Sequence, residues 1–385
     1  MSKVRCTVLP LLLASLYISF SKMDKICLGV DVSAKKIDVC LRLGQQVLSS
    51  RGHIFNTEEG FGSLLEWLDK HLNKHGLSRS DVHVVMEATG TYHENVAQFF
   101  LRHQCACHVM PGHRAKKYLQ SLGKSKNDKL DAKGLSLLGI ERTLPDWKPL
   151  SSGVAELRQL TRQRETFMSQ STAIKNQIHA LESGHYVNEF VLQGYQEMLE
   201  SLKKAVAALD KNIHAVLKQH PELEQNVKYA ESISGVGILT AVVLVAETNN
   251  FAYVESRNQL VCYAGYDITE HQSGSTVRGK KHMSKAGNAH IRRILFMAAS
   301  SAMQHNAACH DLYQRVLARN GGIKMKAHVA VQRKLLVLAY ALVKSKSMYN
   351  LETHLKGVKK NQNEDMATST SISQVVAGTT VASAQ

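Results

Sequence analysis

The sequence contains no cysteine pattern typical of a disulfide framework and no apolar run long enough for a membrane-spanning helix. Its seven cysteines are an odd number without paired spacing, which excludes a disulfide-built secreted domain and indicates reduced thiols. Cys105, Cys107 and His108 suggest zinc ligands, but no second Cys/His pair at ligand spacing completes a set of four. The apolar run over 8–20 is shorter than the roughly 20 residues of a spanning helix. We therefore expect a cytoplasmic protein without membrane contact.

Both ends of the chain are expected to lie outside the folded part. Lys3 and Arg5 precede the first apolar run, so the segment imitates a signal peptide, yet Met23 leads directly into a strand-like run. We expect residues 1–22 to be an over-extended start. Residues 354–385 are polar, rich in Ser, Thr and Ala, and without periodicity, which predicts a disordered tail.

Acidic residues are nearly absent from 271–345, where thirteen Lys and Arg stand against Asp311 alone. Such a stretch is solvated whatever its role. On a chain with a net charge of +16, however, a concentrated basic patch most often meets nucleic acid. The residues predicted to contact nucleic acid are Lys124, Lys126, Gly235, Gly237, Arg278, Lys280, Lys281, Lys285, Arg292 and Arg293.

Residues 23–145 alternate between strand-like and helical patterns. The strand-like runs cover 26–31, 37–43, 46–50, 82–87 and 106–110, and the helical segments cover 58–74 and 93–103. Three strands followed by alternating helix and strand predict an α/β domain with a mixed sheet. A site in such a sheet is expected at the strand ends.

Carboxylates stand at two of these strand ends. Asp31 and Glu87 each close an apolar run, and a buried carboxylate normally shifts its pKa, forms an ion pair or binds a metal. Asp31 alone would also fit a turn that caps a hairpin. The interpretation therefore depends on whether further carboxylates converge on it.

Two further acids lie on a predicted helix. Asp128 and Asp131 share one face after Asn127, a plausible N-cap, although acids in a first turn also complement the helix dipole. Together with Asp31 and Glu87 they form a set of oxygen ligands that suits Mg²⁺. Two such ions about 4 Å apart can clamp a phosphodiester.

The middle of the chain follows a helical period. A proline-containing linker at 145–149 precedes a predicted helical region over 151–225, and residues 195–216 keep a heptad seam. Arg164 and Ser171 interrupt the apolar positions of the first helix. Folding back within one chain and pairing between chains fit equally well; we favour a hairpin that also makes a homo-oligomer contact.

The region 228–350 offers a glycine turn and a serine among cations. Gly235 and Gly237 could present backbone N–H groups to a phosphate, although a tight turn between helices explains them about as well. Ser284 precedes a predicted helix. It could be an ordinary N-cap, or a nucleophile whose alkoxide is favoured by cations and metal.

Six motifs in order resemble the DEDD transposases of insertion sequences, which are related to Piv-type DNA invertases. They are Gly29-Val-Asp31, Met86-Glu87-Ala-Thr-Gly90, Lys126-Asn-Asp128-Lys-Leu-Asp131, Ile233-Ser-Gly235-Val-Gly237, Tyr263-Ala-Gly265 and Ser284-Lys-Ala-Gly-Asn288. The resemblance covers about 23–345. It implies an RNase H-like, RuvC-like first domain and a C-terminal transposase domain in a bacterial, nucleoid-associated protein. With the heptad seam, the expected fold is an α/β domain followed by a helical coiled-coil middle and a mainly helical C-terminal domain.

The resemblance also implies an activity. Asp31, Glu87, Asp128 and Asp131 would bind Mg²⁺ as two ions, and Ser284 would attack DNA and become covalently linked to it. The acids and the serine would combine across subunits of a dimer or tetramer. The family is associated with a structured noncoding RNA that pairs with donor and target DNA, so the implied partners are the element ends, the target and a guide RNA.

Two rival functions fit parts of the sequence. The first is a metal-dependent nuclease or junction resolvase of the same fold, in which water attacks and Ser284 only caps a helix. The second is a non-enzymatic nucleic-acid-binding protein in which the acids are purely structural. Covalent protein–DNA adducts distinguish the transposase from both rivals.

Overall fold

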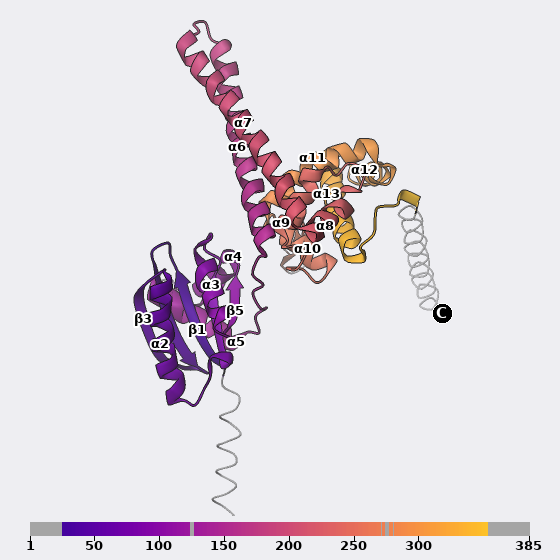
Figure 1. Ribbon diagram of the computed structural model, residues 1–385. Helices are drawn as coiled ribbons and strands as arrows, with labels where there is room; N and C mark the ends of the chain where they lie inside the picture. The colour runs from indigo at the N-terminus through magenta and orange to yellow at the C-terminus, as the bar shows by residue number, and fades with distance from the viewer. Residues whose placement is uncertain (1–24, 124–126, 271, 274–276, 280, 353–385) are drawn as a thin grey trace, which may run out of the picture. The chain divides into compact units, whose positions relative to one another are not determined.

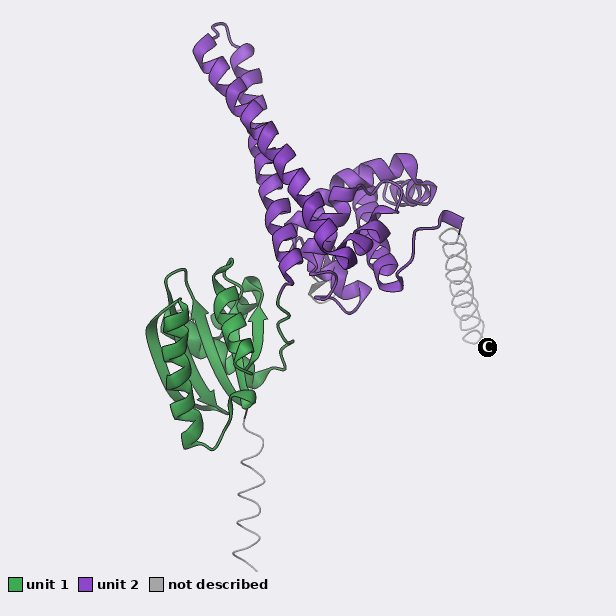
Figure 2. Ribbon diagram, viewed as in Figure 1, with its two compact units in different colours: residues 1–149 green, residues 150–385 purple. Residues whose placement is uncertain are grey.

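The computed structural model describes residues 25–123, 127–270, 272–273, 277–279 and 281–352. The expected over-extended start (1–22) and the expected tail (354–385) lie outside these residues. The chain forms two compact units, residues 1–149 and 150–385 (Figure 2). No described helix is both long and apolar enough to cross a membrane.

The first unit is a five-stranded sheet covered by helices (Figure 1). Its elements are β1 (Ile26–Val32), β2 (Lys36–Leu43), β3 (Gln46–Phe55), α2 (Glu58–Lys74), a 3₁₀ turn (Arg79–Asp81), β4 (Val82–Glu87), α3 (Tyr92–Arg102), β5 (Ala106–Met110), α4 (Gly112–Leu122) and α5 (Asp128–Glu141). The strand order is β3-β2-β1-β4-β5, with β1 antiparallel to β2 and parallel to β4. This order and mixed direction confirm the predicted RNase H-like sheet. β3 is longer than predicted because it continues to Phe55 opposite Lys36.

Alternate residues of β1 face two different helical layers. Leu28 and Val30 pack with Leu64 and Phe100 of α2 and α3. On the opposite face, Cys27 packs against Leu135 of α5. This alternation follows from the two-residue period of a strand, and it places Asp31 on the face that carries α5.

A glycine lets α5 lie directly on β1. A Cβ atom on Gly29 would lie 2.1 Å from the carbonyl oxygen of Ala132 and 2.3 Å from the amide nitrogen of Ser136. One turn further along, a Cβ atom on Gly139 would lie 2.2 Å from the Sγ atom of Cys27. The helix therefore runs antiparallel to β1, and its first turn comes to the end of the strand where Asp31 stands.

The described residues of the second unit form helices and two small two-stranded ribbons. Its elements are α6 (Ser152–Glu182), α7 (Glu189–Gln219), α8 (Pro221–Glu231), α9 (Ile238–Glu247), α10 (Arg257–Ala264), β6 (Ile268–Thr269), β7 (Gln272–Ser273), β8 (Val277–Arg278), β9 (His282–Met283), α11 (Ala289–His305), α12 (Ala307–Arg319) and α13 (Lys324–Ser345). Its core combines the base of α6 and α7 with α8, α9, α10, α11 and α13. This arrangement confirms the prediction of a mainly helical region after the sheet.

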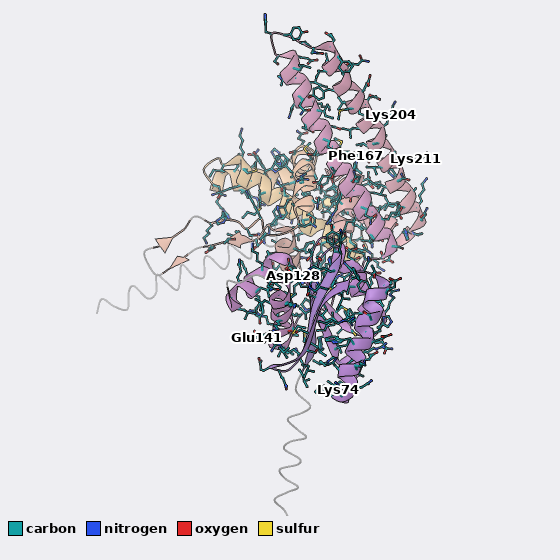
Figure 3. The ribbon with its side chains drawn as sticks, turned by 90° about the vertical axis from the view of Figure 1, so that its left-hand side faces the viewer. Lys74, Asp128, Glu141, Phe167, Lys204 and Lys211 are labelled. Atoms are coloured by element: carbon teal, nitrogen blue, oxygen red, sulfur yellow. The ribbon has the colours of Figure 1, made fainter. Side chains whose placement is uncertain are left out.

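Helices α6 and α7 fold back on each other as a hairpin, the favoured one of the two arrangements that fit the heptad seam (Figure 1). The two polar interruptions of α6 are satisfied locally. Arg164 donates from Nε and Nη2 to the carboxylate of Asp210 on α7, at 2.6 and 3.3 Å, and Ser171 donates to the carbonyl of Phe167. The labelled residues Lys204 and Lys211 lie one heptad apart on α7 (Figure 3).

Replacing Gly29 by alanine should destabilise the first unit. The new methyl group would overlap the backbone of α5, and overpacking of this kind costs about 1–3 kcal/mol or more. Gly62→Ala is a matched control, because nothing lies within 4 Å of a Cβ atom there and alanine in a helix gains about 0.5–1 kcal/mol. Denaturant unfolding of both variants measures the difference; a Gly29→Ala protein as stable as wild type would contradict the packing described.

Candidate active site

Four acids predicted from the sequence meet at one edge of the sheet. Asp31 is the penultimate residue of β1, and Glu87 is the last residue of β4, the parallel neighbour of β1. Asp128 and Asp131 occupy the first turn of α5, which Asn127 caps by accepting from the N–H of Lys129, as predicted. Asp128 and Glu141 mark the two ends of this helix in Figure 3.

The electrostatics of Asp31 show that these carboxylates are close to one another. Burial raises its pKa from 3.8 to about 6, with further contributions from Asp128, Asp131, Glu87 and Asp38. Like charges around a half-buried carboxyl disfavour its ionised form. Asp31 therefore lies at the centre of the acidic cluster, defined here as these five residues.

Asp38 is an acid that the sequence reasoning missed. It pairs directly with Asp31 across the β1–β2 ladder, is 4% exposed and lies against Gly52 of β3. Side chains directly opposite in a ladder lie on one face, and like charges there repel. Its signal was an acid at the second position of the strand-like run 37–43, directly before the apolar residues Val39, Cys40 and Leu41.

The donor set suits a hard divalent cation. It consists of carboxylate oxygens, which Mg²⁺ prefers. Burial and then the neighbouring acids raise the pKa of Asp31, and a bound cation would counteract both effects. Among the described residues no three His, Cys, Asp or Glu side chains are already close enough to hold a metal ion. Lys36 pairs with Asp128 at 3.4 Å, in an exposed ion pair of little energetic weight. Asp31, Glu87, Asp128 and Asp131 remain the residues predicted to hold a metal, and their side chains would have to move closer together to coordinate it.

In the second unit Ser284 stands in a loop between β9 and α11. The amide of Ser284 donates to the carbonyl of Asp267 at 2.8 Å, and the amide of Asn288 donates to the carbonyl of Tyr263 at 2.8 Å. A Cβ atom on Gly287 would lie 2.5 Å from the amide nitrogen of Gly265. The motifs around Tyr263 and Ser284 therefore belong to one structure, which we call the serine loop (residues 284–288 on the end of α10).

Ser284 does not cap the helix that follows it. The cap of α11 is Asn288, whose side chain accepts from the N–H groups of His290 and Ile291 at 3.0 and 3.2 Å. The hydroxyl of Ser284 instead donates to Oδ1 of Asp267, and the N–H of Ala286 donates to the same hydroxyl. The alternative of Ser284 as an N-cap is therefore excluded.

A buried carboxylate anchors the far end of the serine loop. Glu247, fully buried at the end of α9, accepts from Asn288 at 2.7 Å and from Arg162 of α6 at 2.8 and 2.9 Å. Burial alone would raise its pKa, but the bonds and charge of Arg162, with Asn288 and Arg158, hold it below its ordinary value. The base of the hairpin and the serine loop thus share one charge network.

The predicted nucleic-acid contacts fall into three groups. Lys124, Lys126 and Lys280 lie outside the described residues, and the side chain of Arg278 does too. Lys285 is exposed, and Lys281 pairs with Glu270 at 2.5 Å. Arg292 donates to the carbonyl of Ala264 at 2.7 Å, and Arg293 pairs with Glu165.

The two glycines of the predicted phosphate turn differ in their surroundings. Gly235 has a φ of +98°, and a Cβ atom there would lie 2.4 Å from the Cα atom of Ala302 on α11. Gly237 caps α9, with nothing within 4 Å of a Cβ atom. The positive φ and the close packing against α11 are sufficient to explain Gly235 without a ligand. Gly237 is exposed at the N-terminus of α9 and is not required by packing.

Two family models match the chain one after the other. A DEDD-type transposase model named for IS110 matches residues 28–187, and a model for transposases of the IS116/IS110/IS902 family matches residues 227–314. The first includes the acidic cluster, and the second includes the serine loop.

Relatives extend the similarity over most of the chain. The pilin gene-inverting protein of Moraxella bovis is 26% identical over 333 residues, which are 86% of this chain and all of that protein. Its counterpart in Moraxella lacunata is 25% identical over the same length. The transposase for insertion sequence element IS1111A of Coxiella burnetii is 23% identical over 298 residues, 69% of this chain and 79% of that protein.

Asp31→Asn should stabilise the metal-free protein at alkaline pH. The pKa of Asp31 is raised to about 6, so the folded protein favours the protonated carboxyl. The stability associated with this protonated form is fully present below about pH 4 and is lost as pH rises through 6. At pH 8 the neutral amide should recover on the order of 2–3 kcal/mol. Denaturant unfolding in the presence of a chelator, at pH 5 and pH 8, measures the gain.

Asp69→Asn is the control with the opposite sign. Hydrogen bonds from Arg79 lower the pKa of Asp69, so this substitution should leave stability unchanged or reduce it at both pH values. An Asp31→Asn protein that is less stable than wild type at pH 8 would contradict the repulsion inferred within the acidic cluster.

Proposed function

Because the chain belongs to the IS110 family of transposases, we propose that it cuts and rejoins DNA through a covalent bond between Ser284 and a DNA phosphate. Enzymes of this family are DEDD-type transposases, which use a divalent metal. The observation that carries the proposal is the convergence of Asp31, Glu87, Asp128 and Asp131 at one edge of the sheet. The names of the pilin gene-inverting relatives support strand exchange as the reaction.

The acids and the serine have separate tasks in this mechanism. Bound Mg²⁺, as two ions, would neutralise the scissile phosphate, favour the Ser284 alkoxide and stabilise the leaving oxygen. Asp31, Glu87, Asp128 and Asp131 position the charge at the sheet edge. Ser284 holds the DNA end as a phosphoserine ester, which conserves the energy of the phosphodiester and permits rejoining without a nucleotide cofactor.

Basic residues would supply affinity without reading sequence. Lys281 and Lys285, with Lys124, Lys126, Arg278, Lys280, Arg292 and Arg293, are proposed to face phosphates, so binding should weaken steeply with salt. Contacts to phosphate position a protein but specify no bases. We propose that a noncoding RNA selects donor and target DNA by base pairing.

A second copy of the chain is part of the proposal. Tyr186 and Phe190 at the tip of the α6–α7 hairpin are 79% and 86% exposed, and Met198 on the same hairpin is 56% exposed. Large apolar side chains gathered on a surface mark an interaction site. The hairpin is therefore proposed as the contact of a dimer or tetramer, in which the acids of one chain act with Ser284 of another.

The second candidate function is a nuclease of the same fold that uses water. It retains the acidic cluster but gives Ser284 no chemical task. The cap of α11 by Asn288 favours the serine reaction, because it leaves the Ser284 hydroxyl without the capping role that this alternative assigned to it.

Ser284→Ala should abolish covalent protein–DNA adducts while leaving DNA binding intact. Full-length protein is incubated with Mg²⁺ and DNA carrying the element ends, and adducts are resolved on a denaturing gel. Wild type and Ser301→Ala, a half-buried serine of α11, should both form the adduct. An adduct that persists in Ser284→Ala would refute the serine reaction, and cleavage without any adduct would favour water.

A further inference from the structure

The hydroxyl of Ser284 is committed to one carboxylate. It donates a hydrogen bond to Oδ1 of Asp267, a half-buried residue between the end of α10 and β6. Ser284 is half-buried as well, and it accepts from the N–H of Ala286 at 3.3 Å. Ser284 must lose its hydroxyl proton when its Oγ atom attacks a phosphate. In the structure this proton already points at a carboxylate oxygen of Asp267.

This bond is not needed to shape the serine loop. The backbone of Ser284 already donates to the carbonyl of Asp267 at 2.8 Å, and that of Lys285 donates to the carbonyl of Gly265 at 3.2 Å. Close backbone contact between Gly265 and Gly287 fixes the loop further. Lys285 is held at a φ of +54°, a conformation uncommon for residues with a side chain and frequent at functional sites.

The neighbouring carboxylates have other partners. Glu270 pairs with Lys281, and Glu247 is held by Arg162 and Asn288. Within the described part of the chain, Asp267 forms no ion pair. The carboxylate of Asp267 is therefore available to accept a proton, whereas that of Glu247 is held in an ion pair with Arg162.

Several charged groups lie on the elements packed around this pair. Arg292 of α11 reaches the carbonyl of Ala264 beside Gly265, and Lys285 is exposed on the loop itself. His282 and Lys281 lie on or beside β9, which pairs with β6 directly after Asp267. These groups, with Glu270, are the charged side chains on the elements that surround the Asp267 carboxylate.

We propose that Asp267 is the general base that accepts the proton of Ser284, an inference that rests on the proposed function. As the bond between Oγ and phosphorus forms, the hydroxyl proton passes to Oδ1 of Asp267 and the bond from phosphorus to the leaving sugar oxygen breaks. That oxygen takes a proton from water. When a DNA hydroxyl later attacks the phosphoserine, its proton passes to the hydroxide that the first step left. The bond between phosphorus and Oγ breaks, and Asp267 returns its proton to the departing Oγ atom, so the carboxylate is regenerated.

The test is the rate of adduct formation by Asp267→Asn as a function of pH. Asparagine keeps the size and the backbone contacts but cannot accept the proton. With full-length protein, Mg²⁺ and DNA carrying the element ends, the single-turnover rate at pH 7 should fall about 10²–10⁴-fold. DNA affinity should not change, and the deficit should shrink as pH rises because hydroxide replaces the base.

Two further variants complete the test. Asp311→Asn, an exposed carboxylate on α12, should react like wild type, and Asp267→Glu should retain much of the rate because it keeps a carboxylate. If Asp267→Asn fails to fold, a pH profile of Asp267→Glu shifted from that of wild type still supports the proposal, and an identical profile opposes it.

The outcomes separate this inference from the function on which it rests. Wild-type rates in Asp267→Asn, or a deficit that is the same at every pH, would overturn the role of Asp267 while leaving Ser284 as the nucleophile. Absence of the adduct in wild type would overturn both.

Discussion

The contact between α5 and β1 at Gly29 is the constraint on which the acidic cluster depends. Without a side chain at Gly29, the backbone of α5 rests on the strand at Ala132 and Ser136, and its first turn comes to Asp31. The cost is electrostatic, because burial and neighbouring acids raise the pKa of Asp31 to about 6. A divalent cation at these carboxylates, as proposed above, would offset this electrostatic cost.

In the second unit, too, glycines allow close backbone packing next to the functional residue, here Ser284. Gly265 and Gly287 bring two backbone segments together, while the buried pair of Glu247 and Arg162 connects the loop to the base of α6. The hairpin and the serine loop are consequently parts of one packed structure.

Much of this could be predicted from the sequence because strand ends and helix starts carry local signals. The apolar run ending in Asp31 and the cap at Asn127 were sufficient to predict β1 and the first turn of α5. Asp38, Asp267 and Asn288 were missed, because their roles arise from register and from contacts between distant segments. Asp38 faces Asp31 only through the β1–β2 pairing, and Asp267 meets Ser284 only through the β6–β9 ribbon.

The most direct test of the central claim, that the acids and Ser284 form one reaction centre across chains, is a mixing experiment. Asp31→Asn and Ser284→Ala proteins are each expected to form no adduct with DNA alone. Mixed under conditions that allow exchange of subunits, they should form it again, because each chain supplies what the other lacks. If mixed oligomers form, as shown by pull-down with two different tags, and still yield no adduct, the account of a shared centre is contradicted.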